Sequence, residues 1–301
     1  MDNYYCVAGF SFRLTAPDGY LEPGLLWNYK PFAQEASVES DLAFHCEICD
    51  ALPDGTAELY YHDEPEEDDM PRIDIMRQSG GFLFVMCPSA RSTHIYKLWT
   101  SCDFSRGMLL KWDAGDAGRF PVDNALMLMF ALRTASMSTL EMHASVVVRD
   151  GRGYLFLGKS GTGKSTHSRM WLENIPQSFL LNDDNPVVRV MDDGEVRVFG
   201  SPWSGKTPCY VNRDCKVGGF VRIRQYPENI IERQGVLESY ASLYTSCSGM
   251  KMNSGMADDI HRTIEKVIDS VPCWLLKCLP DGDAARVCFN SVRYGDDGAA
   301  E

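Results

Sequence analysis

A short loop, residues 158–165, combines residue types and spacing that suit phosphate binding. It reads Gly158-Lys159-Ser160-Gly161-Thr162-Gly163-Lys164-Ser165 and fits the pattern G-x-x-x-x-G-K-[ST] at every fixed position. Glycines let the backbone turn its amides toward phosphate oxygens, and a helix starting at the end of the loop adds the positive end of its dipole. Lys164 can reach the β- and γ-phosphates, and the Ser165 hydroxyl can ligate magnesium. The loop therefore predicts binding of a nucleoside triphosphate, ATP or GTP, with Mg²⁺; the alternatives are a merely flexible loop and a loop that binds without catalysis.

Two adjacent carboxylates, Asp183 and Asp184, follow this loop at a distance that predicts a return to it. A helix of about ten residues after Lys164 carries the chain roughly 15 Å away. The short apolar strand expected at 179–182 then returns it by about 14 Å. We therefore expect the acid pair beside the phosphate loop, where one carboxylate can hold magnesium and the other can accept a proton. An ordinary Asp-Asp-Asn-Pro turn is the alternative.

A second loop, Gly200-Ser201-Pro202-Trp203-Ser204-Gly205-Lys206-Thr207-Pro208, follows an expected strand at 196–199. Its turn-forming residues predict an exposed Trp203 and a single presented lysine, Lys206. Such a lysine can clamp a transferring phosphoryl group, although a turn anchored by prolines with a solvated lysine is the alternative. Arg222 and Arg224, two residues apart on a strand, share one face and either hold phosphate or pair with surface acids.

Three segments together resemble a known superfamily. They are Met142-His143-Ala144-Ser145, the run from Phe156 to Thr166, and Leu180-Leu181-Asn182-Asp183-Asp184. Residues of about 140 to 200 are thereby similar to the HPr kinase/phosphorylase C-terminal domain and to phosphoenolpyruvate carboxykinases. Carboxykinases share the Ser-Gly-Thr-Gly-Lys loop and the Asp-Asp pair, and HPr kinases share a histidine shortly before the loop.

The resemblance implies an α/β domain with a central mixed sheet of the carboxykinase type and a kinase-type site. It implies Ser165 and Asp184 on magnesium, Asp183 as the base, and His143 close by. Residues 158–166, Thr166 included, would contact the nucleotide. The resemblance to HPr kinases is incomplete, because Lys159 stands where those enzymes usually carry an acid and their glycine-rich signature is replaced by residues 200–208. We therefore transfer the reaction class and not the protein substrate.

The elements that must position these residues fall into two regions. Residues 1–118 are β-rich, with expected strands at 57–61, 82–86 and 94–99 between Pro, Gly and Asp turns. Residues 119–301 are expected to form the nucleotide-binding domain. Its further elements are expected as helices at 121–137, 165–173, 235–247, 258–270 and 281–292, and strands at 143–148, 154–157 and 273–278.

Two other candidate sites have simpler explanations. Cys46 and Cys49 form a CxxC beside His45, but Phe44, Cys46 and Ile48 alternate as on one face of a strand, and no second CxxC completes a zinc site. The acidic run at 62–69, HDEPEEDD, indicates a solvated loop rather than a calcium site, because it contains a proline and has no patterned ligand spacing.

Charge and hydropathy limit the partners. The net charge is -13, with 42 acidic and 29 basic residues, which disfavours nucleic acid and acidic membranes as partners. The first residues, Met1-Asp2-Asn3-Tyr4-Tyr5, show no secretion signal, and the longest apolar run, 125–132, is far shorter than the ~20 residues that span a bilayer. We expect a cytoplasmic protein that binds a nucleoside triphosphate; a homo-oligomer stays open.

These observations favour an ATP-dependent, magnesium-dependent kinase that transfers the γ-phosphoryl group to a hydroxyl of a small molecule or of a protein serine. Two alternatives remain at this stage. One is a nucleotide-binding sensor or regulatory protein without turnover, and the other is a lyase of the phosphoenolpyruvate carboxykinase type.

Overall fold

The computed structural model describes residues 1–36, 38–65, 68–113, 118–205 and 207–293. The chain divides into two compact units, residues 1–134 and the residues from Ala135 onward. The division follows helix α1 (Phe120–Thr134), whereas the boundary expected from the sequence, between 118 and 119, precedes it. Each unit contains a mixed β-sheet, so the chain is of the mixed α/β class.

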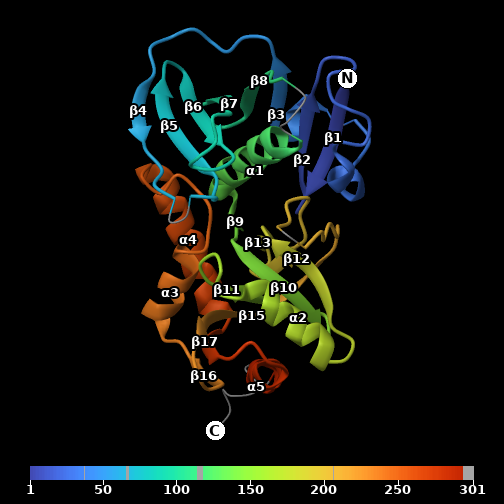
Figure 1. Ribbon diagram of the computed structural model, residues 1–301, viewed down its shortest axis with the longest axis vertical. Coiled ribbons are helices and arrows are strands. Elements are labelled where there is room, and N and C mark those ends of the chain that lie inside the picture. Colours follow the sequence, from blue (N-terminus) through green and yellow to red (C-terminus); the bar gives the residue numbers. More distant parts are fainter. Residues whose placement is uncertain (37, 66–67, 114–117, 206, 294–301) are drawn as a thin grey trace. The chain divides into compact units, whose positions relative to one another are not determined.

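The N-terminal unit is an eight-stranded sheet in the order β1-β2-β3-β8-β7-β6-β5-β4, packed against α1 (Figure 1). β3 runs parallel to β2 and β8, and the other pairs are antiparallel. The strands are β1 (Asp2–Val7), β2 (Phe10–Thr15), β3 (Leu42–Cys49), β4 (Glu58–Tyr61), β5 (Arg72–Gln78), β6 (Gly81–Cys87), β7 (Tyr96–Ser101) and β8 (Arg106–Leu110); two short 3-10 helices are η1 (Trp27–Phe32) and η2 (Glu39–Asp41).

Alternation of side chains explains the core of this unit. Phe44, Cys46 and Ile48 of β3 are buried as the pattern predicts, and the Phe44 ring stacks on Phe12 at 4.7 Å between centroids. Cys46 is therefore a packing residue, and burial raises the pKa of its thiol to about 12.

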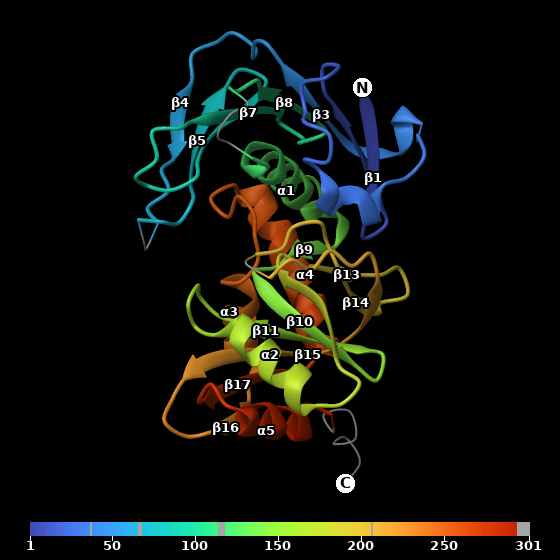
Figure 2. The same ribbon diagram turned by 45° about the vertical axis from the view of Figure 1, so that its right-hand side comes forward.

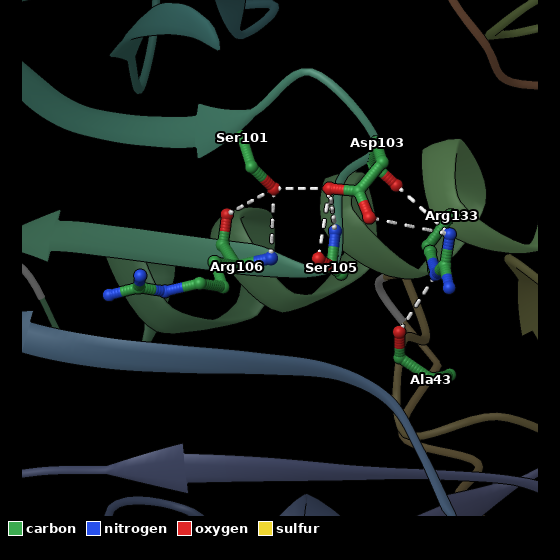
Figure 3. A network of polar contacts seen from close by, with 6 residues as sticks. All are labelled: Ala43, Ser101, Asp103, Ser105, Arg106 and Arg133. Carbon is green, nitrogen blue, oxygen red and sulfur yellow. Dashed lines mark hydrogen bonds and ion pairs between the residues drawn. The ribbon is translucent and has the colours of Figure 1, made fainter. Parts of the chain in front are cut away.

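The end of α1 is tied to the sheet by Arg133 (Figure 3). Its Nε donates to the Ala43 carbonyl at 2.9 Å, and its Nη1 donates to the Asp103 carbonyl at 3.2 Å. The Asp103 carboxylate in turn accepts from the hydroxyls of Ser101 and Ser105, which closes the turn between β7 and β8. Arg133 thus joins the helix to β3 and to the turn between β7 and β8.

The C-terminal unit is a nine-stranded sheet in which β12-β10-β11-β15-β14-β13-β9 form a path and β17 pairs with β15 and β16. The strands are β9 (Thr139–Glu141), β10 (Ala144–Arg149), β11 (Arg152–Leu157), β12 (Phe179–Asp184), β13 (Val187–Val190), β14 (Val196–Phe199), β15 (Asp214–Gln225), β16 (Ile230–Arg233) and β17 (Cys273–Cys278). The bounds predicted for β14 and β17 are confirmed to the residue.

The helices of this unit are α2 (Lys164–Asn174), α3 (Val236–Tyr244), α4 (Ser254–Ser270) and α5 (Gly282–Val292), with a 3-10 turn, η3, at Ala135–Met137. α2 and α5 pack side by side (Figure 2). Between them and the sheet lies a core that includes Phe156, Trp171, Val221 and Trp274; we call this side of the sheet the α2 face.

Three helix boundaries differ by three or more residues from those expected. The helix predicted at 235–247 ends at Tyr244. The helix predicted at 121–137 ends at Thr134 and continues as the 3-10 turn η3. α4 begins at Ser254, four residues before the expected 258, because the Asn253 side chain accepts from the Met256 amide and caps it. No helix among the described residues is both long enough and apolar enough to cross a membrane.

Candidate functional site

Strand register brings the phosphate loop and the acid pair to the same end of the C-terminal sheet. Ala144, the first residue of β10, lies between Leu157 at the end of β11 and Asp184 at the end of β12. On the other side of Leu157, the parallel strand β15 presents Arg222. The length of the helix after the loop and that of the returning strand were expected to cancel and so to bring the acid pair back to the loop. This expectation is met, because β12 ends two strands away from the start of the loop.

The loop has the backbone geometry of a phosphate cradle. Gly158, Gly161 and Gly163 have φ values of 156°, 75° and 103°, conformations that side chains disfavour. A Cβ at Gly158 would lie 2.4 Å from Thr162 Oγ1, so only glycine fits there. Because α2 begins at Lys164 with Gly163 as its N-cap, no side chain caps its first-turn amides. The loop can therefore offer backbone donors to an anion.

Lys164 is held at the mouth of this loop. Its side chain is buried, and Nζ donates to the carbonyls of Gly158 at 2.9 Å and Lys159 at 3.2 Å. Burial lowers its pKa, while the carboxylates of Asp184 and Asp183 raise it. An ammonium group near two carboxylates and a ring of amides is suited to triphosphate oxygens.

The two acids project differently. Asp183 pairs with Ser145, whose hydroxyl contacts Ser168 of α2 at 2.5 Å, so Asp183 belongs to the α2 face and is buried. Asp184 pairs with Ala144 on the opposite face and is half-buried. Its φ of 155° is rare for a residue with a Cβ, and such strain is concentrated at functional sites. The different directions agree with a division of roles between the two.

His143 is brought to Asp184 and not to Asp183. Its Nε2 lies 3.8 Å from Asp184 Oδ1. Burial lowers the pKa of His143, and Lys164 lowers it further, whereas Asp184 raises it. Burial likewise raises the pKa of Asp184, against the opposing effects of His143 and Lys164. The pair can therefore hold one proton between two groups that burial pushes toward neutrality.

A third carboxyl, that of Glu141, lies close enough to Asp184 for the two charges to interact. Glu141 belongs to no motif in the sequence. It is 2% exposed, and burial raises its pKa to about 8, against the opposing effect of a hydrogen bond with Ser248 and with a smaller upward contribution from the charge of Asp184. Its neighbourhood is fixed by the segment 246–248, whose Ser246 carbonyl accepts from the His143 amide at 2.6 Å. Only the fold reveals this residue, because a lone glutamate at a strand end gives no sequence signal.

The loop that follows β14 is packed against the acid pair. The Gly205 amide donates to the Asp183 carbonyl at 2.7 Å, and Ser204 forms an isolated antiparallel β-bridge with Asp184. Trp203, expected to be exposed, is 3% exposed, so that expectation is wrong. The reason is Asn182, whose Nδ2 donates to the Trp203 carbonyl at 3.2 Å and draws the loop inward. Lys206 lies outside the described residues.

Two cavities flank the loop, one on each side of the end of β15. The first, of about 570 Å³, lies on the α2 face and is lined by residues that include Thr166, Tyr226, Pro227, Leu279 and Pro280. The second, of about 490 Å³, is lined by Gly158 and Lys159, by Arg222 and Arg224, and by residues of α3. Arg222 and Arg224 thus share one face, as the sequence predicts.

The candidate metal ligands are sparse. Within the described parts of the chain, no three His, Cys, Asp or Glu side chains gather as a metal-binding group. Ser165 is exposed in the first turn of α2, directly after Lys164. A magnesium ion here would use Ser165 and one acid, with phosphate oxygens completing its shell, which fits the preference of Mg²⁺ for few protein ligands.

Comparison with known proteins adds little to this geometry. No protein-family model matches the sequence, and no curated protein matches it. Among solved structures, the Hpr(Ser) kinase/phosphatase from Coxiella burnetii is similar at a TM-score of 0.32 and 14% identity, covering 52% of this chain and 99% of that chain. The likeness is distant.

Proposed function

We propose that this chain is a nucleoside-triphosphate-dependent kinase that transfers a γ-phosphoryl group to a hydroxyl, in a C-terminal unit of the carboxykinase type. The observation that carries the proposal is the row of residues at one sheet end, in which Asp184, Ala144, Leu157 and Arg222 lie on adjacent strands. This row sets a carboxylate on one side of the proposed phosphate-binding loop and a cation on the other.

The loop and the adjacent cavity define one orientation for the bound nucleotide. Lys164 and the amides of residues 158–165 hold the phosphates, and the cavity on the α2 face accepts the base and ribose between Thr166 and the exposed rings of Tyr226 and Pro227. A magnesium ion held by Ser165 and Asp184 would neutralise charge on the phosphate oxygens. ATP and GTP both fit this description.

In the transfer step, the acceptor hydroxyl oxygen forms a bond to the γ-phosphorus, and the bond from that phosphorus to the β,γ-bridging oxygen breaks. The electron pair leaves with the nucleoside diphosphate. The hydroxyl proton passes to a carboxylate of the acid pair: the resemblance assigns this role to Asp183, whereas Asp184, beside His143, shares the face of Arg222 and would take the proton from an acceptor bound on that side. The chain's remaining contribution is positioning and charge stabilisation, as phosphoryl transfer requires.

The test begins with nucleotide binding, because a sensor without turnover would share it. Mg-ATP should raise the melting temperature of the wild type and not that of Lys164→Ala. Arg286→Gln, a change of an exposed residue on α5, serves as the matched control and should respond like the wild type. Equal stabilisation of all three proteins by Mg-ATP would place the nucleotide elsewhere and refute the proposal.

Turnover is then tested with γ-labelled ATP and fractionated cell extract. Label that appears on a metabolite or a protein supports a kinase, and its loss in Lys164→Ala ties the activity to the loop. Tight binding without transfer would identify a sensor. Release of CO₂ from oxaloacetate would identify the lyase alternative.

A further inference from the structure

Alternation along β15 separates two environments on either side of the phosphate loop. Ile223 is buried in the core of the α2 face. Its neighbours Arg222 and Arg224 therefore point to the opposite face, toward α3, where Arg222 Nη1 donates to Thr245 Oγ1 at 3.1 Å. The cavity of about 490 Å³ lies on this side, and we call it the arginine cavity.

The charge of the arginine cavity is unusual for this protein. Among the residues that the structure describes, neither Arg222 nor Arg224 has an acidic side chain within 4 Å. The lining also contains Lys159, and its one acid is the exposed Glu238 of α3. In a chain with a net charge of -13, a cavity lined by two arginines that have no acidic side chain within 4 Å in the described part of the chain favours an anion.

The strand register places the two arginines at different distances from the phosphate loop. Arg222 is level with Leu157, the residue before the loop, and its charge is close enough to lower the pKa of Lys164, after the larger effects of burial and the two acids. Arg224 lies two residues farther along the strand, about 6.6 Å outward. Arg222 is therefore next to the start of the phosphate loop, and Arg224 lies about one small molecule's length farther out.

We propose that the arginine cavity is the acceptor site of the proposed kinase, and that the acceptor is a small anionic molecule that carries a hydroxyl. Its phosphate or carboxylate would be held by Arg224, with Lys159 beside it, so that its hydroxyl reaches the loop between Arg222 and the acid pair. The volume is that of a small-molecule site. This inference rests on the proposed function.

The first experiment measures anion binding without turnover. The protein is saturated with Mg-ADP, which occupies the loop, and inorganic phosphate or acetate is titrated by calorimetry. We expect Arg224→Gln to weaken binding of one of these anions about tenfold or more, the usual effect of losing a hydrogen bond to a charged group. Glu238→Gln should instead tighten binding, because it removes the acid from the lining. The control, Arg286→Gln, should leave binding unchanged.

Arg224→Gln and Glu238→Gln are expected to change the anion affinity in opposite directions, which a general effect on folding would not do. Both variants alter exposed side chains, so their folding is expected to be retained and is checked by their melting temperatures. Equal anion affinity in the wild type, Arg224→Gln and Glu238→Gln would overturn the proposal. A response to phosphate alone identifies a phosphorylated acceptor, and a response to acetate alone identifies a carboxylate.

The second experiment measures transfer from γ-labelled ATP to glycerol 3-phosphate, glycerate, uncharged glycerol and a serine-containing peptide. We expect label on a charged alcohol, with a raised KM for it and an unchanged KM for ATP in Arg224→Gln. Label confined to glycerol or to the peptide would overturn the inference and leave the kinase proposal standing. Loss of Mg-ATP binding at the loop would instead refute the proposed function itself, so the two failures are distinguishable.

Discussion

Replacement of Glu141 with glutamine is expected to stabilise the C-terminal unit, by an amount that grows with pH. Burial raises the pKa of this carboxyl from 4.5 to about 8. In the unfolded chain the carboxyl loses its proton near pH 4.5, whereas in the folded protein it keeps the proton until about pH 8. Between these values folding must take up a proton, so stability falls as pH rises.

The magnitude follows from the width of this window. Each pH unit is worth about 1.36 kcal/mol, so the carboxyl costs the folded protein about 3 kcal/mol at pH 7 and less than about 1 kcal/mol at pH 5. Glutamine does not titrate, and any mismatch of its amide in the site is the same at both pH values. The difference between the two pH values therefore isolates the buried charge.

The assay is urea unfolding of the wild type and Glu141→Gln at pH 5, 6 and 7, followed in the transition of the C-terminal unit. The gain in the free energy of unfolding should rise by about 2 to 3 kcal/mol from pH 5 to pH 7. Glu265→Gln, on the exposed side of α4, should show no such rise. A gain that is the same at every pH would show that Glu141 is not held neutral by burial, and the reasoning would fail.

Two further predictions concern the acid pair and the N-terminal unit. Asp184→Asn should raise the magnesium concentration needed for turnover, while Asp183→Asn should keep magnesium-dependent nucleotide binding and lose about 10²–10⁴-fold in the rate of transfer. Magnesium titration of turnover in both variants checks this. The reverse pattern would make Asp184, with His143, the base. Arg133→Met should destabilise the N-terminal unit by about 2 kcal/mol, because it removes two charged donors to the carbonyls of Ala43 and Asp103. Arg106→Met in the same turn should change stability little in the same urea assay, since only the backbone of Arg106 joins the network (Figure 3).

Local signals predicted the parts of the site that depend on neighbouring residues in the chain. The glycines and Lys164 identify the phosphate loop, and the lengths of α2 and β12 place the acid pair, because both follow from fixed rises per residue. The burial of Trp203 could not be predicted, since it depends on hydrogen bonds from Asn182, twenty-one positions earlier. Glu141 was missed for a similar reason: its pKa depends on packing by the segment 246–248.

The strand pair that ends in the two aspartates contains one irregularity. The register between β10 and β12 shifts after Val146, because Val146 pairs with Asn182 while Val147 pairs with Leu180. Leu181 is the extra residue of this bulge, and the regular pairs that follow it set the faces to which Asp183 and Asp184 turn. Loss of Leu181 would leave a regular ladder with the same pairs on both sides, so the two directions would be kept. The bulge therefore absorbs one residue of strand length without moving the acids, and the site can survive the deletion of that residue.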